Sequence, residues 1–169
     1  MKTIVANSDK DASALEIVIH NRQRAFQFRT DVLRDFAMKL VRDELKLERA
    51  SLGIAFLGVN PMAKANQQFL NHTGATDVIT FAYPVEGGDQ LSGELLICPA
   101  VAVDQAQEFG TSPASELVRY IVHGVLHLRG FDDLDPASRR IMKKEENRLV
   151  RRLEQWLPIK NLEFKARSQ

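Results

Sequence analysis

Residues 123–133 read HGVLHLRGFDD and contain two histidines, His123 and His127, four positions apart. On a helix with 3.6 residues per turn, this spacing places both side chains on one face, one above the other. Two imidazoles arranged in this way can bind one metal ion from a rigid scaffold. The stretch also indicates the fold, because it predicts a long helix that ends in a turn at Gly130.

The helix expected over residues 112–130 is apolar around the two histidines, so the histidines occupy a narrow polar stripe of a buried helix. The apolar positions are Leu117, Val118, Ile121, Val122, Val125, Leu126 and Leu128. Asp132 and Asp133 follow Gly130, where a third ligand is expected. A carboxylate oxygen is a competent third ligand and leaves an open position for water.

Two other interpretations of the same stretch remain. In the first, both histidines are core residues bonded to carbonyl groups, and the two aspartates cap the next helix. The glycine turn followed by an Asp pair favours the metal site over this interpretation. The second is a zinc protease, but such enzymes need a glutamate directly after the first histidine, and Gly124 stands there.

The regions outside this helix contain patterns typical of strands and patterns typical of helices. Alternating and β-branched residues predict four strands, at residues 14–20, 51–58, 77–83 and 93–98. Helical spacing and helix-start residues, with Thr30 and Asn60 as expected caps, predict four more helices, at residues 30–46, 60–70, 99–109 and 136–156. Strands come early and helices cluster late, which predicts an α+β fold with a small mixed β-sheet packed against helices.

The length and composition indicate one soluble domain. A chain of 169 residues, 44% apolar and 27% charged, fits a single domain over residues 1–169, with loose termini at 1–13 and 157–169. Its one cysteine, Cys98, excludes a disulfide framework and a Cys-rich zinc module, and fits a reducing compartment. No segment has the pattern of a signal peptide or a membrane span, so we expect a cytoplasmic protein without a membrane partner.

The last predicted helix is strongly basic, although the whole chain has a net charge of only +1. One face carries four basic side chains, which we call the basic face: Arg140, Lys144, Arg148 and Arg151. Such a face is often only the solvated side of an amphipathic helix. Beside a metal-dependent hydrolase site, it is also what a phosphodiester substrate would need.

With these residues identified, the sequence resembles the YbeY family of metal-dependent endoribonucleases, also called rRNA maturation factors. The resemblance rests on HGVLHLRGFDD at 123–133, TDVITF at 76–81 and GEL at 93–95, in the family's order and spacing. It extends from about residue 14 to residue 156.

The resemblance implies that His123 and His127 are the first two zinc ligands and that Asp133 is the third. The family usually has histidine at the third position, and an oxygen ligand there also suits manganese, iron or nickel. Two further positions differ from the family pattern. Phe131 replaces a tyrosine, and Leu70 stands where the family commonly carries an arginine implicated in RNA cleavage.

The function that the resemblance implies is cleavage of single-stranded RNA during rRNA processing, notably at the 3′ end of 16S rRNA, and in ribosome biogenesis. The expected partners are rRNA and the ribosome or its small subunit, and no DNA partner is expected. Two alternatives remain at this point. Leu70 motivates a non-catalytic ribosome-assembly factor with a structural metal, and the metal site alone also suits a hydrolase of another substrate.

Overall fold

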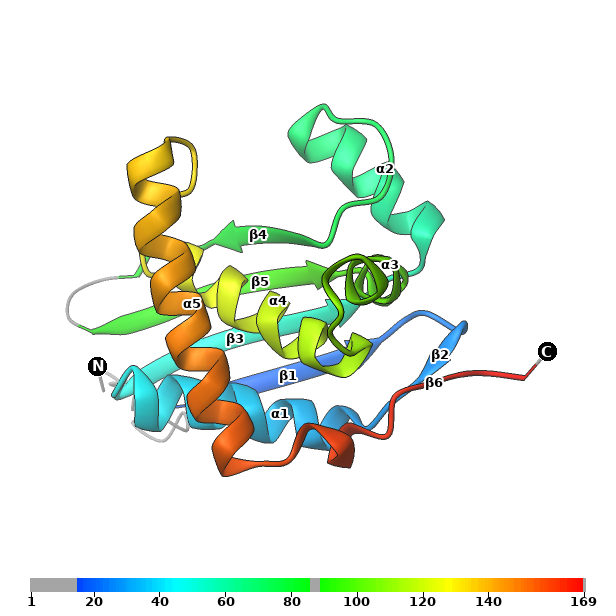
Figure 1. Cartoon of the computed structure of the whole chain (residues 1–169). Coiled ribbons are helices and arrows are strands. Elements are labelled where there is room, and N and C mark those ends of the chain that lie inside the picture. The colour runs from blue at the N-terminus through cyan, green and yellow to red at the C-terminus, as the bar shows by residue number, and fades with distance from the viewer. Residues whose placement is uncertain (1–14, 86–88, 169) are drawn as a thin grey trace, which may run out of the picture.

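A four-stranded mixed sheet lies at the centre of the computed structural model, which describes residues 15–85 and 89–168 (Figure 1). The strand order is β1-β3-β5-β4. The strands span Leu15–Asn21 (β1), Arg49–Phe56 (β3), Gln90–Ile97 (β5) and Val78–Ala82 (β4). β1, β3 and β5 run parallel to one another, whereas β4 runs antiparallel to β5. This arrangement confirms the predicted α+β fold with a small mixed sheet.

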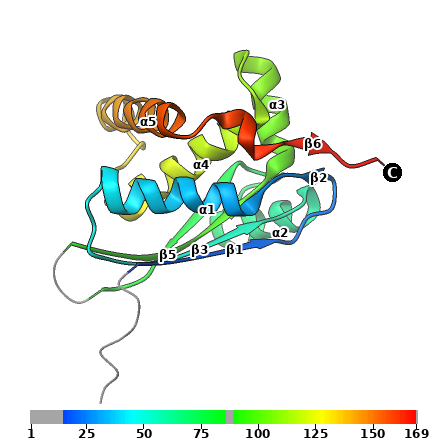
Figure 2. The same ribbon diagram turned by 90° about the horizontal axis from the view of Figure 1, so that it is seen from below.

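Helices make up the remaining layers. They are α1 (Thr30–Lys39), which continues as a π-helical turn (Leu40–Glu44), α2 (Val59–Leu70), α3 (Pro99–Phe109), α4 (Pro113–Leu128) and α5 (Pro136–Trp156). Figure 2 shows α1 and α4 on one face of the sheet and α5 outside them. None of the helices among the described residues has both the length and the apolar character that crossing a membrane requires.

The alternation of side chains along the strands explains why one sheet face is covered. In β3 and β5, the residues that point towards the helices are fully buried, as the paired residues Ile54 and Leu95 illustrate. Their neighbours on the other face, such as Ser51 and Glu94, are exposed. Burial of the apolar half of each strand against α1 and α4 therefore defines the main core.

Helix α4 packs unusually close to the sheet at Gly124. A β-carbon at this position would lie 2.5 Å from Cδ2 of Leu95, which no ordinary contact allows. Glycine therefore lets the helix approach the centre of β5, and this approach fixes the depth at which the neighbouring His123 sits. The N-terminus of α4 is held by Ser112, whose Oγ accepts a hydrogen bond from the amide of Ser115 at 3.1 Å.

Two predicted helix starts are wrong in detail. Thr30 and Asn60 were expected to be caps, but both lie inside their helices. The residues that precede the helices are Arg29 and Gly58, and neither makes a side-chain capping bond. In a sequence, a cap is recognised by residue type alone. The residue at which a helix begins also depends on the backbone conformation of the segment before it.

The segment after α5 is not a loose end, contrary to our expectation for residues 157–169. It forms a 3₁₀ turn (Ile159–Leu162) and a short strand, β6 (Lys165–Ala166), which pairs with β2 (Phe26–Gln27). Leu162 is fully buried, and the ring of Phe164 stacks on that of Phe28 with centroids 5.7 Å apart. Two isolated apolar residues carry no periodic signal, so the sequence could not predict this docking. The other expected loose end, residues 1–13, lies outside the described residues.

Candidate metal centre

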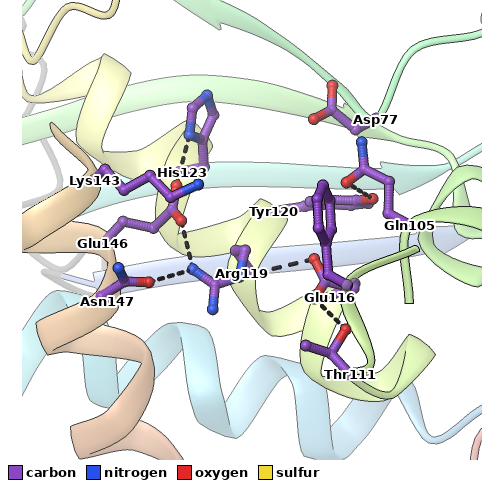
Figure 3. Close-up of a pocket in the computed structure, with 11 residues that line it drawn as sticks. Asp77, Gln105, Thr111, Glu116, Arg119, Tyr120, His123, Lys143, Glu146 and Asn147 are labelled. Carbon is purple, nitrogen blue, oxygen red and sulfur yellow. Dashed lines mark hydrogen bonds and ion pairs between the residues drawn. The ribbon is translucent and has the colours of Figure 1, made fainter. Parts of the chain in front are cut away.

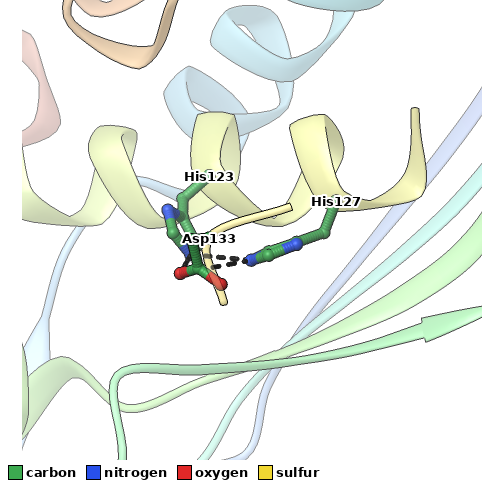
Figure 4. Close-up of side chains that lie close together, drawn as sticks. All are labelled: His123, His127 and Asp133. Atoms are coloured by element: carbon green, nitrogen blue, oxygen red, sulfur yellow. Dashed lines mark hydrogen bonds and ion pairs between the residues drawn. The ribbon is translucent and has the colours of Figure 1, made fainter. Parts of the chain in front are cut away.

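Helix α4 and the loop after it bring three candidate ligands together (Figure 4). The four-residue spacing puts His123 and His127 on one side of α4, with their Nε2 atoms 3.0 Å apart. Gly130, with φ of 87°, lets the chain turn back after the helix. As a result, Oδ2 of Asp133 lies 3.9 Å from Nε2 of each histidine.

The outer nitrogens of both imidazoles are already engaged. Nδ1 of His127 lies 3.0 Å from the carbonyl oxygen of Phe131, which only accepts, so this nitrogen carries a proton. Nδ1 of His123 donates in the same way to Oε2 of Glu146 at 2.9 Å. In the neutral rings that bind metals, both Nε2 atoms therefore present lone pairs to each other and to the Asp133 carboxylate. Three electron-rich atoms held this closely favour a cation between them.

The spacing of these atoms fits a metal ion. Bonds of about 2.0–2.2 Å to three ligands, as zinc forms, need ligand atoms about 3–4 Å apart. The observed separations of 3.0, 3.9 and 3.9 Å meet this requirement. Two nitrogens and one oxygen form a donor set that zinc and other divalent first-row metals accept.

The two aspartates of the loop have different places. Oδ1 of Asp132 accepts the amide protons of Asp133 and Leu134, at 2.7 and 3.1 Å, so this side chain stabilises the turn. Asp133 alone faces the histidines. The cap of α5 is Asp135, which bonds to the amides of Ala137 and Ser138. The interpretation in which Asp132 and Asp133 cap the next helix is therefore wrong.

Two charged residues that we did not predict form a hydrogen-bonded chain to Nδ1 of His123: Glu146 bonds to His123, and Arg119 bonds to Glu146. Glu146 of α5 is only 7% exposed, and its second oxygen, Oε1, lies 2.6 Å from Nη1 of Arg119. Burial raises the pKa of Glu146, but hydrogen bonds from His123 and Arg119 outweigh burial and lower it. Arg119 stands four residues before His123, so helical spacing is a signal that could have identified it. No local signal identifies Glu146, which lies 23 residues from His123 on another helix.

The charges around His123 favour a cation at its free nitrogen. Burial lowers the pKa of His123, but the hydrogen bond to Glu146 and the charge of Glu146 outweigh burial, so the pKa lies above its usual value. The negative surroundings that attract a proton attract a metal cation as well. The electrostatics and the geometry of the site therefore agree.

A cavity of about 430 Å³ lies beside His123, between α3, α4 and α5 (Figure 3). Lys143, Glu146 and Asn147 line it from α5, and Asp77 lines it from the start of β4. Asp77 is itself fixed, because its Oδ1 accepts the hydroxyl proton of Thr76 at 3.0 Å and the amide proton of Val78 at 2.8 Å. The TDVITF stretch thus reaches the same site as the histidine helix.

The predicted basic face lies elsewhere on α5. None of its four residues is among the described residues that line the cavity; these four are Arg140, Lys144, Arg148 and Arg151. All four are exposed to solvent, and Arg148 pairs with Glu145 at 2.6 Å. Leu70 is about half exposed at the end of α2. The structure therefore brings together the three predicted metal ligands, whereas the four predicted RNA-binding residues do not line the cavity beside His123.

Comparisons with known proteins identify the family. The family model described as Endoribonuclease YbeY matches residues 18–154. A protein named Endoribonuclease YbeY from Elusimicrobium minutum is 37% identical over 106 residues, which cover 61% of this chain and 74% of that protein. A protein of the same name from Finegoldia magna is 29% identical over 142 residues, which cover 81% of this chain and 93% of that protein.

A solved structure supports the fold independently of these sequence matches. The solution structure of TM1509 from Thermotoga maritima aligns with a TM-score of 0.62 at 24% identity, over 86% of this chain and 95% of that one. At this identity the likeness concerns the fold alone. The family match over residues 18–154 includes most of β1, the other three strands of the main sheet and all three candidate metal ligands. The chain therefore belongs to the Endoribonuclease YbeY family.

Proposed function

We propose that this chain is a metal-dependent endoribonuclease that cleaves single-stranded RNA in rRNA processing, including maturation of the 3′ end of 16S rRNA, and so acts in ribosome biogenesis. The observation that carries the proposal is the convergence of Nε2 of His123, Nε2 of His127 and Oδ2 of Asp133 within 3.9 Å of one another. The name shared by its relatives supports RNA as the substrate.

His123, His127 and Asp133 would hold one divalent metal ion. We propose zinc, and the Asp133 oxygen makes manganese, iron and nickel the alternatives to test. When bound at such a site, a divalent ion supplies Lewis-acid chemistry, because it activates water as a nucleophile and polarises a phosphoryl oxygen. A metal with these three protein ligands would have a position left for exchange, as in hydrolytic metal sites.

The chain's own residues prepare this site. Glu146 and the carbonyl of Phe131 hold the protons of His123 and His127 on Nδ1, which leaves both Nε2 atoms free to coordinate. Arg119 keeps Glu146 ionised by donating to its other oxygen. Two hydrogen bonds fix the backbone of Asp133. Its amide donates to Oδ1 of Asp132, and its carbonyl accepts from Nε of Arg139 at 3.1 Å.

For RNA binding, we propose that the basic face of α5 attracts the phosphate backbone without sequence preference. These exposed cations, Arg140, Lys144, Arg148 and Arg151, would give an affinity that falls steeply with salt. The partners that we propose are rRNA and the small ribosomal subunit, and the place of action is the cytoplasm.

The two alternatives are less well supported. An assembly factor with a structural metal, or a hydrolase of another substrate, is not favoured by relatives that are named endoribonucleases. Leu70, which stands where the family commonly carries an arginine, is the departure from the family pattern that motivates the assembly factor.

Cleavage of a labelled single-stranded RNA by tag-free protein tests the proposal. The His123→Ala variant and a chelator should each abolish cleavage, whereas His20→Ala, which removes an exposed histidine from β1, should leave it intact. Equal cleavage in all samples would mean a contaminating nuclease. No cleavage by metal-loaded protein would overturn the proposal in favour of the assembly factor.

A further inference from the structure

We propose that the cavity beside His123 binds the nucleoside portion, base and ribose, of one nucleotide in single-stranded RNA, next to the phosphodiester that is cleaved. This inference rests on the proposed function for its substrate class. It adds a second binding site, formed by the α3 and α5 residues that line the cavity. This site is separate from the basic face of α5.

The position of the cavity fits this role. His123 stands between the two regions, because its Nε2 faces His127 and Asp133 while its Nδ1 faces Glu146 on the cavity wall (Figure 3). A group in the cavity is therefore one imidazole ring away from the metal-binding atoms. The volume of about 430 Å³ lies within the range of about 300–1,000 Å³ that small-molecule sites have.

The charges in the cavity disfavour a phosphate group there. Asp77, Glu116 and Glu146 contribute three carboxyl groups, and among the described lining residues two permanently charged cations, Arg119 and Lys143, face them. Arg119 is largely neutralised, since it lies 2.6 Å from Glu146 and 3.7 Å from Glu116. An anion would meet net negative charge, so an uncharged part of the nucleotide is the better ligand.

Two side-chain amides line the cavity, Asn147 from α5 and Gln105 from α3. Oδ1 of Asn147 on α5 accepts from Nη1 of Arg119 at 2.7 Å, which leaves its NH₂ group for a ligand. Oε1 of Gln105 on α3 accepts from the hydroxyl of Tyr120 at 2.7 Å, with the same consequence. Nucleobases and ribose present carbonyl, ring-nitrogen and hydroxyl acceptors that match these donors.

An aromatic side chain completes the chemistry. Phe109, at the end of α3, lines the cavity and is 62% exposed, so its ring is accessible to a ligand. Proteins hold single-stranded bases by stacking them on aromatic rings and by bonding their edges to amide groups. Phe109, Gln105 and Asn147 supply both kinds of contact around one cavity.

The side-chain amide signals of Asn147 and Gln105 in ¹H–¹⁵N NMR spectra test the inference directly. We expect titration with uridine, cytidine, adenosine or guanosine to shift both signals, and inorganic phosphate to leave them in place. Asn147→Asp keeps the acceptor for Arg119 but removes the NH₂ donor, so it should weaken nucleoside binding by about fivefold or more. Gln155→Glu makes the same chemical change at an exposed position of α5 and should have no effect.

Three results would overturn the inference: no shift with any nucleoside, an equal shift with phosphate, or unchanged affinity in Asn147→Asp. The spectrum of each variant also reports whether the variant is folded. The test is independent of cleavage. RNA that is cleaved while both amide signals stay in place overturns this inference alone, and RNA that is bound at the cavity but never cleaved overturns the nuclease proposal alone.

Discussion

Oε2 of Glu146 lies 2.9 Å from Nδ1 of His123, so α5 bonds directly to one of the candidate metal ligands on α4. The two helices are joined by the loop that carries Asp133, and this hydrogen bond closes the structure around the loop. A displacement of α5 would therefore move both the support of His123 and the third ligand. The candidate metal centre is thus coupled to helix packing, although its three candidate ligands lie within eleven residues of sequence.

Glu146→Gln should weaken metal binding by about 10- to 100-fold, because loss of a supporting carboxylate makes the imidazole a poorer ligand. The affinity can be measured by competition with a chromophoric chelator. Glu145→Gln is the matched control, since Glu145 is adjacent but pairs with Arg148 outside the site. An equal effect of both variants would contradict the positioning role of Glu146.

Asp133→His should change the choice of metal. Imidazole nitrogen is a softer ligand than carboxylate oxygen, so the ratio of zinc affinity to manganese affinity should rise by about tenfold. Direct titration of the metal-free protein with each ion measures this ratio. Asp132→Asn keeps a side-chain acceptor for the turn and should leave the ratio unchanged. The same ratio in all three proteins would show that Asp133 is not a ligand.

Gly124→Ala should destabilise the fold although alanine is the better helix former. The new β-carbon would lie 2.5 Å from Cδ2 of Leu95, and relief of such overpacking costs about 1–3 kcal/mol. Urea denaturation measures the loss. In a Leu95→Ala background the same substitution should cost far less, because the clashing methyl group is gone. Equal costs in both backgrounds would place the strain elsewhere.

The stability of the α1 end should depend on pH through Asp43. Hydrogen bonds from Arg42 and Lys39 hold the pKa of Asp43 at about 2, below its usual value of 3.8. A lowered pKa in the folded state stabilises the protein above the unfolded value, and this contribution is lost as the pH falls from about 4 to about 2. Asp43→Asn should therefore lower Tm slightly at pH 7, and this difference should shrink as the pH falls through about 2. The pair is exposed, so added salt should reduce the difference.

Local patterns predicted much of this structure. The last helix was expected at residues 136–156 and occupies Pro136–Trp156, because Asp135 and Pro136 form a strong start signal and an apolar stripe follows. The four strands of the main sheet were also expected near their observed positions. Such signals depend on neighbours within a few residues, and for this reason they can be recognised in the sequence alone.

The residues that form hydrogen bonds to the candidate ligand His123, directly or through Glu146, could not be predicted in the same way. Arg119, Glu146 and Asn147 form one network, but they come from two helices and are 27 and 28 residues apart in sequence. Their meeting depends on the angle and depth at which α5 packs on α4. The basic face of α5, in contrast, could be read from the sequence, but the structure separates it from the cavity.

The three candidate metal ligands and the fold class follow from local sequence patterns. His123, His127 and Asp133 meet because one helical turn and one glycine turn are local geometry, and the alternation of strands and helices defines the layers. Three features depend on tertiary packing instead: the strand order β1-β3-β5-β4, the hydrogen bond between His123 and Glu146, and the stacking of Phe164 on Phe28. These features arise from contacts between distant segments, whose free energy depends on how whole faces fit together and not on the pattern within any one segment.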